Sequence, residues 1–438
     1  MRICIGTGMI VALAVVGLAA GLSAQSAPDL PPDQPITLSQ AIAYALANHA
    51  SVTSAQRELA AAGADVRGVR SAYFPQITAD SSYSRRGYEG GQTGSGLRRT
   101  GDFTDRQTVI GISQMVLDGG QTRTALRQAS ASEQMAAADL DLARQDRVLA
   151  VTVAYFEALR ARRLASISTE AVTEAEQQRA LIQARIDAGD AAPVDVYPAE
   201  VQLANARVEQ VAAQNNARVA ATALRNQMGL GPGPELTLVD VEGPAPEPPK
   251  MADAVSAALR SRPEIARSAA GIERQRAALS LSRYQTLPIP TASATYDRGL
   301  AGNGFDTQWF AGVTVTMNIF DGGAAIQGVK SNRARLEALT LDDAQLRKDI
   351  AAEVESARLD LASALERLTA SQASLTLAGK NLEVAREKYA QGLAIPLEVT
   401  TALVEEVRAR ANYAQALYDS HISRAQLDRA MGRRIEGS

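Results

Sequence analysis

The sequence contains the same structural unit twice, and this duplication limits the fold more than any other feature. Across the 438 residues, matching positions lie 213 apart near the start of each unit and 203 apart in the remainder. The units therefore differ by ten residues, the difference between the two spacings, and such a difference belongs in a loop. The matched positions include Leu46 and Leu259, Pro75 and Pro288, Asp118 and Asp321, Gly189 and Gly392, Pro193 and Pro396, and Met228 and Met431.

The duplication divides the chain into segments. The first repeat covers residues 38–229 and the second covers residues 251–432, with a short tail at 433–438. A connector at 230–250 joins the repeats, and its prolines predict an extended segment with a short strand at 236–239. These prolines are Pro232, Pro234, Pro244, Pro246, Pro248 and Pro249.

Each repeat predicts the order helix, strand, loop, strand, very long helix, tight turn and long helix. In the first repeat we expect a helix at 38–72 and two strands, at 76–86 and 107–117. Glycine-rich, polar loops are predicted between the strands, at 87–106 and, in the second repeat, at 298–308.

The strands have the alternation of a membrane barrel. Apolar residues of the second repeat fall on one strand face and small or polar residues on the other. This pattern is typical of strands that turn one face to lipid and the other to a pore. The first set is Ala311, Val313, Val315, Met317 and Ile319, and the second is Gly312, Thr314, Thr316 and Asn318.

The helix predicted after Asp118 runs to Ala188, about 68 residues or on the order of 100 Å. Asp118 with Gln121 fits a capping box, so we interpret the aspartate as a helix start rather than a catalytic group. Charged and amide side chains recur along this helix and its counterpart, which excludes both as membrane spans. Their small apolar residues must therefore face other helices in water.

Each long helix ends at a glycine that a proline follows closely. The pairs are Gly189 with Pro193 and Gly392 with Pro396. Glycine accepts the left-handed cap of a helix end and proline suits the first turn of the next helix. Both places are therefore predicted to be compact tips of helical hairpins.

The N-terminus predicts a secretory signal peptide over residues 1–24. A basic Arg2 precedes an apolar run at 9–22, and small residues follow it. Cys4 is the only cysteine of the sequence, so the mature chain would have no thiol. The run is short for a membrane anchor.

The charges and rare residue types exclude several functions. With 45 basic and 48 acidic residues, the chain lacks the basic field that holds nucleic acid. The two histidines, His49 and His421, have no partner at a metal-ligand spacing. We therefore expect no enzyme activity, no metal and no cofactor.

Four strands in one chain cannot close a barrel, and an open strand edge in lipid leaves backbone groups without hydrogen bonds. Several chains must therefore pool their strands. Eight strands would fill their own interior, so an open pore needs three chains or more.

In the order and spacing of these features, the chain from Leu38 to Gly432 resembles the TolC family of outer-membrane efflux and secretion channels. The resemblance rests on the repeated Leu-Asp-Gly-Gly and Phe-Asp-Gly-Gly segments at 117–120 and 320–323, the tips, and the closing Met-Gly pairs. It implies an α+β membrane protein with four barrel strands per chain, continued by a long helical barrel in the periplasm. It also implies a homotrimer with twelve strands in the outer-membrane lipid, whose tips meet a periplasmic adaptor and an inner-membrane pump.

The resemblance further implies a periplasmic gate. Tyr389 and Asp195 stand where the family has a tyrosine and an aspartate that link the two tips. Ala394 stands in place of the arginine of a further link, so one link is missing. Glu398 matches one acidic residue of the constriction, whereas Thr401 replaces another. We hypothesise that Glu398 forms a cation-preferring ring, with a solvent-facing residue near a helix start as the alternative.

Other interpretations and the cargo stay open at this point. Tyr83, Tyr296, Trp309 and Phe310 are predicted near strand ends as an interfacial girdle, with core packing as the alternative for Phe310. A periplasmic coiled-coil adaptor or scaffold is the alternative function, although it leaves the strands unexplained. Drug, metal and secreted protein all remain candidates for the cargo.

Overall fold

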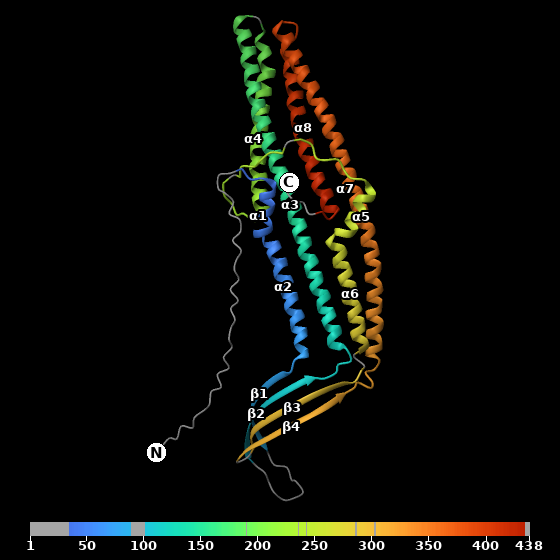
Figure 1. Cartoon of the computed structure of the whole chain (residues 1–438). Helices are drawn as coiled ribbons and strands as arrows, with labels where there is room; N and C mark the ends of the chain where they lie inside the picture. The colour runs from blue at the N-terminus through green and yellow to red at the C-terminus, as the bar shows by residue number, and fades with distance from the viewer. Residues whose placement is uncertain are drawn as a thin grey trace, which may run out of the picture.

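The computed structural model describes residues 35–88, 101–189, 191–234, 236–241, 243–284, 287–301 and 304–433. Figure 1 shows an elongated molecule with a sheet at one end and the tips of two helical hairpins at the other. The predicted signal peptide and Cys4 lie outside the described residues, as does most of the predicted tail.

The sheet has the four antiparallel strands that the sequence predicts, in the order β1-β2-β3-β4. Their bounds are β1 Gln76–Tyr88, β2 Gly101–Met115, β3 Ile289–Ala301 and β4 Gly304–Thr316. The predicted loops are wrong in extent, because the strands continue into both of them. Twelve residues, 89–100, separate β1 from β2 and two, 302–303, separate β3 from β4, which accounts for the ten-residue difference between the repeats.

The very long helices are α3, Gln121–Ala188, with 68 residues, and α7, Ala324–Ala390, with 67. Asp118 starts α3 as expected, but without the predicted capping box. Its carboxylate accepts the backbone N–H of Gly120 at 2.9 Å and that of Thr122. The Gln121 side chain instead donates to the carbonyl of Tyr284, 3.1 Å away.

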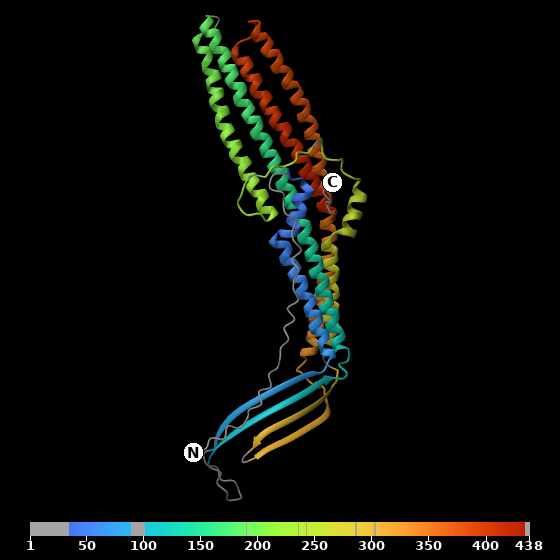
Figure 2. The same cartoon turned by 60° about the vertical axis from the view of Figure 1, so that its left-hand side comes forward.

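The return helices are α4, Val196–Met228, and α8, Pro396–Ala430, and a 3-10 turn, η2 at Pro193–Asp195, precedes α4. Two shorter helices lie beside the long ones near the sheet: α2, Ala50–Arg70, which the 3-10 turn η1 at Ser71–Tyr73 follows, and α6, Pro263–Tyr284. Figures 1 and 2 show a curved layer in the order α4, α3, α8, α7 near the tips and α2, α3, α6, α7 near the sheet.

The predicted single helix at 38–72 is wrong, because the chain breaks at His49 between α1, Leu38–Asn48, and α2. His49 is extended, and its Nδ1 accepts the Ser51 N–H at 3.1 Å, which caps α2. The second repeat breaks in the same way at Arg262, between α5, Met251–Ser261, and α6. Because of these breaks, α1 and α5 do not continue the direction of α2 and α6 and lie outside the layer.

A belt of α1, α5 and the connector 230–250 packs across the middle of the layer (Figure 2). Within the described part of the connector, the predicted strand is reduced to one parallel bridge between Ile36 and Leu238. Two hydrophobic clusters lie beneath the belt, one mainly from each repeat, and Tyr418 of the second repeat joins the first cluster. They share matched residues: Val151 and Val354, Leu224 and Leu427, and Met228 and Met431.

Candidate functional site

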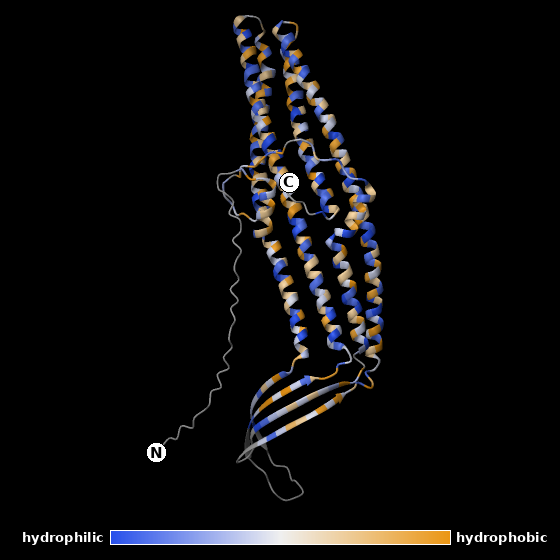
Figure 3. Ribbon diagram, viewed as in Figure 1, coloured by the Kyte–Doolittle hydropathy of each residue, from blue (hydrophilic) through white to orange (hydrophobic). Residues whose placement is uncertain are grey.

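The sheet presents its apolar residues to the outside rather than to a core. Val313 and Val315 of β4 and Ile77 of β1 are all mostly exposed, and apolar residues recur along the strands (Figure 3). β4 has thirteen residues, more than the length of about ten that lets a tilted strand cross the hydrocarbon core. This face has the dimensions of a lipid contact.

The aromatic residues predicted as a girdle lie inside the strands and not near their ends, because the strands are longer than expected. Tyr296 and Trp309 are direct partners in the β3–β4 register. Phe310 is 56% exposed, which disfavours the core-packing alternative. Phe310 lies on the opposite strand face from Trp309, together with Gly312 and Thr314. A girdle on the apolar face can therefore include only Tyr83, Tyr296 and Trp309, and that girdle stays a prediction.

The described helices supply no membrane span, since none is both long enough and apolar enough to cross a bilayer. Figure 3 shows hydrophilic and hydrophobic residues mixed along their whole length. No group of three or more histidine, cysteine, aspartate or glutamate side chains among the described residues could hold a metal ion.

Both hairpin tips have the predicted geometry. Gly189 ends α3 with φ +84° and Gly392 follows α7 with φ +73°, values that only glycine adopts easily. Pro396 is the first residue of α8, and Pro193 opens the 3-10 turn before α4. In its described residues, each tip is therefore a short turn between antiparallel helices.

The three predicted gate residues lie at these tips, but the chain does not link them. Tyr389 is 4% exposed, and its hydroxyl has no hydrogen-bond partner among the described residues. Asp195 instead accepts the backbone N–H of Ala192, 3.2 Å away. Glu398 is exposed in the first turn of α8. The Tyr389–Asp195 link and the Glu398 ring stay predictions for the assembled protein.

The structure adds polar contacts between the hairpins that the sequence analysis missed. Arg410 of α8 pairs with Glu406, which is 5% exposed, and with Glu174 of α3 at 3.2 Å. Arg386 of α7 reaches the same Glu174 at 3.2 Å. Glu406 is four residues from Arg410 on the same helix, whereas Glu174 lies more than 200 positions from both arginines. No local spacing could therefore reveal the two pairs that join the hairpins.

A second charged cluster joins the helix ends under the belt. Glu264 accepts from Arg262 at 2.9 Å and from Arg429 at 3.0 Å, and Arg262 also reaches Glu353 at 2.5 Å. Burial would raise the pKa of Glu264, but the hydrogen bond from Arg262 and the charges of both arginines hold that pKa below its ordinary value.

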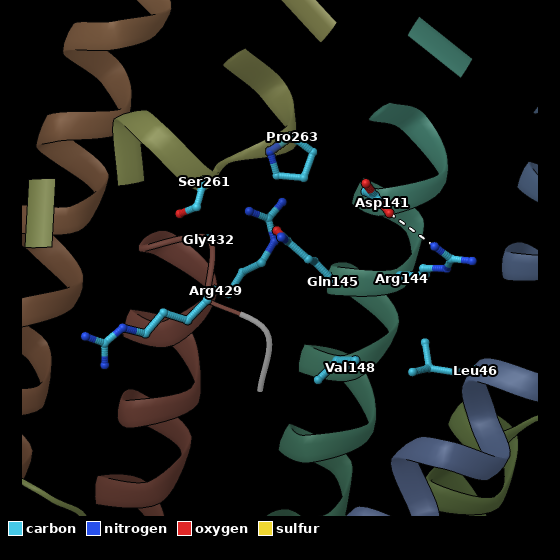
Figure 4. A pocket seen from close by; sticks show the side chains of 10 residues that line it. Leu46, Asp141, Arg144, Gln145, Val148, Ser261, Pro263, Arg429 and Gly432 are labelled. Atoms are coloured by element: carbon cyan, nitrogen blue, oxygen red, sulfur yellow. Dashed lines mark hydrogen bonds and ion pairs between the residues drawn. The ribbon is translucent and has the colours of Figure 1, made fainter. Parts of the chain in front are cut away.

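A cavity of about 570 Å³ lies beside this cluster (Figure 4). Asp141, Arg144 and Gln145 line it from α3, and Arg429 lines it from α8. Arg144 pairs with Asp141 at 3.2 Å, as the dashed line in Figure 4 marks. Arg429 is likewise paired, with Glu264 and Asp146, so both of these arginines at the cavity are matched by carboxylates.

Two buried tyrosines tie the belt to the layer. The Tyr155 hydroxyl lies 2.9 Å from the carbonyl of Ile36 and 2.6 Å from that of Val239. Burial raises the pKa of Tyr155 to about 12, so the hydroxyl stays protonated. Tyr418 donates to the carboxylate of Asp240 at 2.9 Å, and burial and that carboxylate raise its pKa. The belt is therefore fixed by hydrogen bonds as well as by its apolar clusters.

The fold matches solved outer-membrane channels. The CmeC outer membrane channel of Campylobacter jejuni superimposes with a TM-score of 0.79 at 17% identity, over 90% of this chain and 85% of that one. The outer membrane protein VceC of Vibrio cholerae gives 0.77 at 18% identity, over 90% and 96%. The fold is thus that of the TolC-like channels, with four strands per chain continued by long helices.

Sequence comparison gives the family. The chain is 24% identical over 402 residues to the outer membrane efflux protein BepC of Brucella suis, covering 91% of this chain and 85% of BepC. It is 26% identical over 323 residues to the protein CyaE of Bordetella pertussis, covering 71% and 66%. The family model described as "Outer membrane efflux protein" matches residues 41–230 and 254–433. The chain belongs to the outer membrane efflux protein family; it is a TolC-family channel protein of the cell outer membrane and extends into the periplasm.

Proposed function

We propose that three copies of this chain form the exit duct of a tripartite efflux system or of a type I secretion system. The duct is a passive conduit without catalytic activity. The observation that carries this proposal is a four-stranded sheet whose two edges have no partner strand among the described residues, and whose exposed apolar face is continuous with helices of on the order of 100 Å. The alternative, a periplasmic scaffold in water, leaves that apolar face unexplained.

The sheet edges support an assembly of several chains. Among the described residues, no strand pairs with the outer edge of β1 or of β4. Unpaired backbone groups are very unfavourable in lipid, so β1 of one chain would pair with β4 of the next. Two chains would give a barrel filled by its own side chains, whereas three give twelve strands and an open interior.

The outer helices carry matching apolar stripes. On α7, Leu341, Leu359 and Leu377 are exposed at intervals of 18 residues, which is five helical turns, so all three lie on one face. On α4 an exposed stripe contains Tyr197, Val201, Val208 and Val219, whose intervals of four, seven and eleven residues keep them on one helix face. Because α4 and α7 are the two edges of the layer near the tips, the stripes are suited to meet between neighbouring chains.

The tips support docking of a periplasmic adaptor and an inner-membrane pump. Val194 and Tyr197 are exposed at the first tip, and Leu393, Ile395 and Leu397 at the second. Apolar side chains gathered at the end of a rod in water indicate a protein contact. We expect the tips, with Gly189, Pro193, Gly392 and Pro396 in their turns, to face these partners.

Glu398 gives a prediction about ion preference. If three copies of this exposed carboxylate line the inner end, the pore prefers cations, and Glu398→Gln should shift the reversal potential in a salt gradient toward zero. The measurement is the reversal potential of single channels in a planar bilayer. Glu209→Gln, at an exposed carboxylate in the middle of α4 and away from the tip, is the control. An unchanged reversal potential in Glu398→Gln would mean that the residue only faces solvent.

The test of the proposed function is reconstitution of the purified full chain in planar lipid bilayers. A duct gives discrete conductance steps of a water-filled pore without any energy source. A scaffold protein gives no conductance and stays in the aqueous phase.

A further inference from the structure

Arg185, near the end of α3, makes two contacts with the end of α7. Its guanidinium carbon lies 4.2 Å from the centroid of the Tyr389 ring. Its Nη2 also donates to the carbonyl of Ala390 at 3.3 Å. Since α3 belongs to the first hairpin and α7 to the second, both contacts cross from one hairpin to the other within a single chain.

The Tyr389 ring is a firm support for this contact. Tyr389 belongs to a buried cluster to which all four helices of the tips contribute: Ile182, Ala199, Leu382, Ala385, Val399, Ala402 and Leu403. The hydroxyl, by contrast, is buried without a hydrogen-bond partner among the described residues. Within the chain, the ring and not the hydroxyl therefore joins the hairpins.

Arginine suits this position better than lysine. A planar guanidinium can lie over an aromatic ring and donate from its edge to a carbonyl at the same time, whereas an ammonium group is a compact, strongly hydrated charge that has no flat face to stack on the ring. The half-buried setting strengthens the cation–π contact, because fewer water molecules compete for the charge. At the second tip, Ala394 has no charge with which to make such a link.

We propose that Arg185 fastens the two hairpins to each other through the ring of Tyr389, and that this fastening holds the inner end of the duct closed. The closure rests on the proposed function, whereas the fastening itself does not. Arg185 acts through Tyr389 and is a positioning residue. The nearby contacts of Arg386 and Arg410 with Glu174 add to the same joint.

Tyr389 could join the hairpins through its ring, by the contact with Arg185, or through its hydroxyl, by the predicted link to Asp195, and substitutions distinguish the two. If the ring carries the contact, Tyr389→Phe keeps the hairpins together and Tyr389→Leu releases them. If a hydroxyl link to Asp195 carries it, both variants release them. Arg185→Ala should behave like Tyr389→Leu, and Arg185→Lys should lie between Arg185→Ala and the unchanged chain. Arg179→Ala is the control, because Arg179 pairs with Glu200 inside the first hairpin.

Spin labels on the tips measure the joint directly. Cysteines replace Val194 and Leu393, which are 63% and 73% exposed, and labelled full-length chains are diluted with unlabelled ones. Cys4 lies in the predicted signal segment and is the only native cysteine. Pulsed electron paramagnetic resonance measures the distribution of distances between the two labels. This distribution should become longer and broader in Arg185→Ala and Tyr389→Leu, and should not change in Tyr389→Phe or Arg179→Ala. An unchanged distance in Arg185→Ala, or an equal change in Tyr389→Phe, overturns the proposal.

Conductance then tests the link to closure. Loss of the cation–π contact should raise the open-to-closed ratio of single channels about fivefold to thirtyfold. A changed tip distance without any conductance, in the unchanged chain as well as the variants, supports the fastening and overturns the duct. A conducting chain in which Arg185→Ala changes neither quantity supports the duct and overturns the fastening.

Discussion

At the scale of single residues, the charged side chains that matter most are those taken out of water at helix junctions. The Arg262 side chain is 4% exposed and keeps its charge because Glu264 and Glu353 both accept from it. Such a cluster holds the start of α6 against the end of α8. Its strength depends on the ionisation of Glu264, which makes the junction sensitive to acid.

Replacing Glu264 tests this dependence. The folded state lowers the pKa of Glu264, so its contribution to stability is complete above the ordinary pKa of about 4.5 and is lost as the pH falls through the folded value. Glu264→Gln should cost about 2 kcal/mol at pH 7, since it leaves Arg262 and Arg429 with one partner fewer. The difference in thermal unfolding temperature from the unchanged chain, followed by circular dichroism in detergent, should shrink below about pH 4.5.

Glu273→Gln is the matched control, because Glu273 pairs with Arg276 on the exposed surface of the same helix. We expect it to change stability by less than about 0.5 kcal/mol at any pH. A deficit in Glu264→Gln that stays constant across the acid range would contradict the assignment.

At the scale of elements, successive side chains of each strand point to opposite faces of the sheet, so odd and even residue numbers of one strand mark its two faces. Val313 lies on the apolar face of β4 and Thr314 on the opposite face. Val313→Arg should hinder insertion into the outer membrane by about 2–4 kcal/mol. The yield of membrane-inserted, urea-resistant protein measures this effect. Thr314→Arg is the control, and equal losses in both variants would mean that the two faces do not differ in their contact with lipid.

The elements that sequence reasoning predicts well are those fixed by local pattern. The 68-residue α3, the glycine turns and the strand count follow from periodicity and from helix-end chemistry. The break at His49 does not, because it depends on contacts from elsewhere in the chain. Met228 at the end of α4 is buried against α1, and a Cβ added to Gly229 would lie 3.3 Å from the His49 Cα.

The predicted loops were too long for a related reason. Glycine and polar residues suggest loops when read alone, yet cross-strand hydrogen bonds keep Gly101 and Gly304 in strands, paired with Tyr88 and Ala301. At the tips, the sequence located Tyr389 but missed Arg185. The contact between them joins residues 204 positions apart, and no spacing within one helix reveals such a pair.

At the scale of the whole molecule, the open edges lie on the same two sides from end to end. One edge consists of α4, α2 and β1, and the other of α7 and β4. Each edge thus combines unpaired strand backbone in the sheet with an exposed apolar stripe on a long helix. A single rotation between neighbouring chains would cover both kinds of edge at once, which is the condition for a closed ring.

The native mass of the protein in its membrane is the most direct test of this arrangement. The full chain would be extracted from outer-membrane fractions with mild detergent and weighed by native mass spectrometry. The trimeric duct predicts a particle of three mature chains that stays intact when the detergent is diluted. A monomer or dimer released from cells without detergent would contradict it.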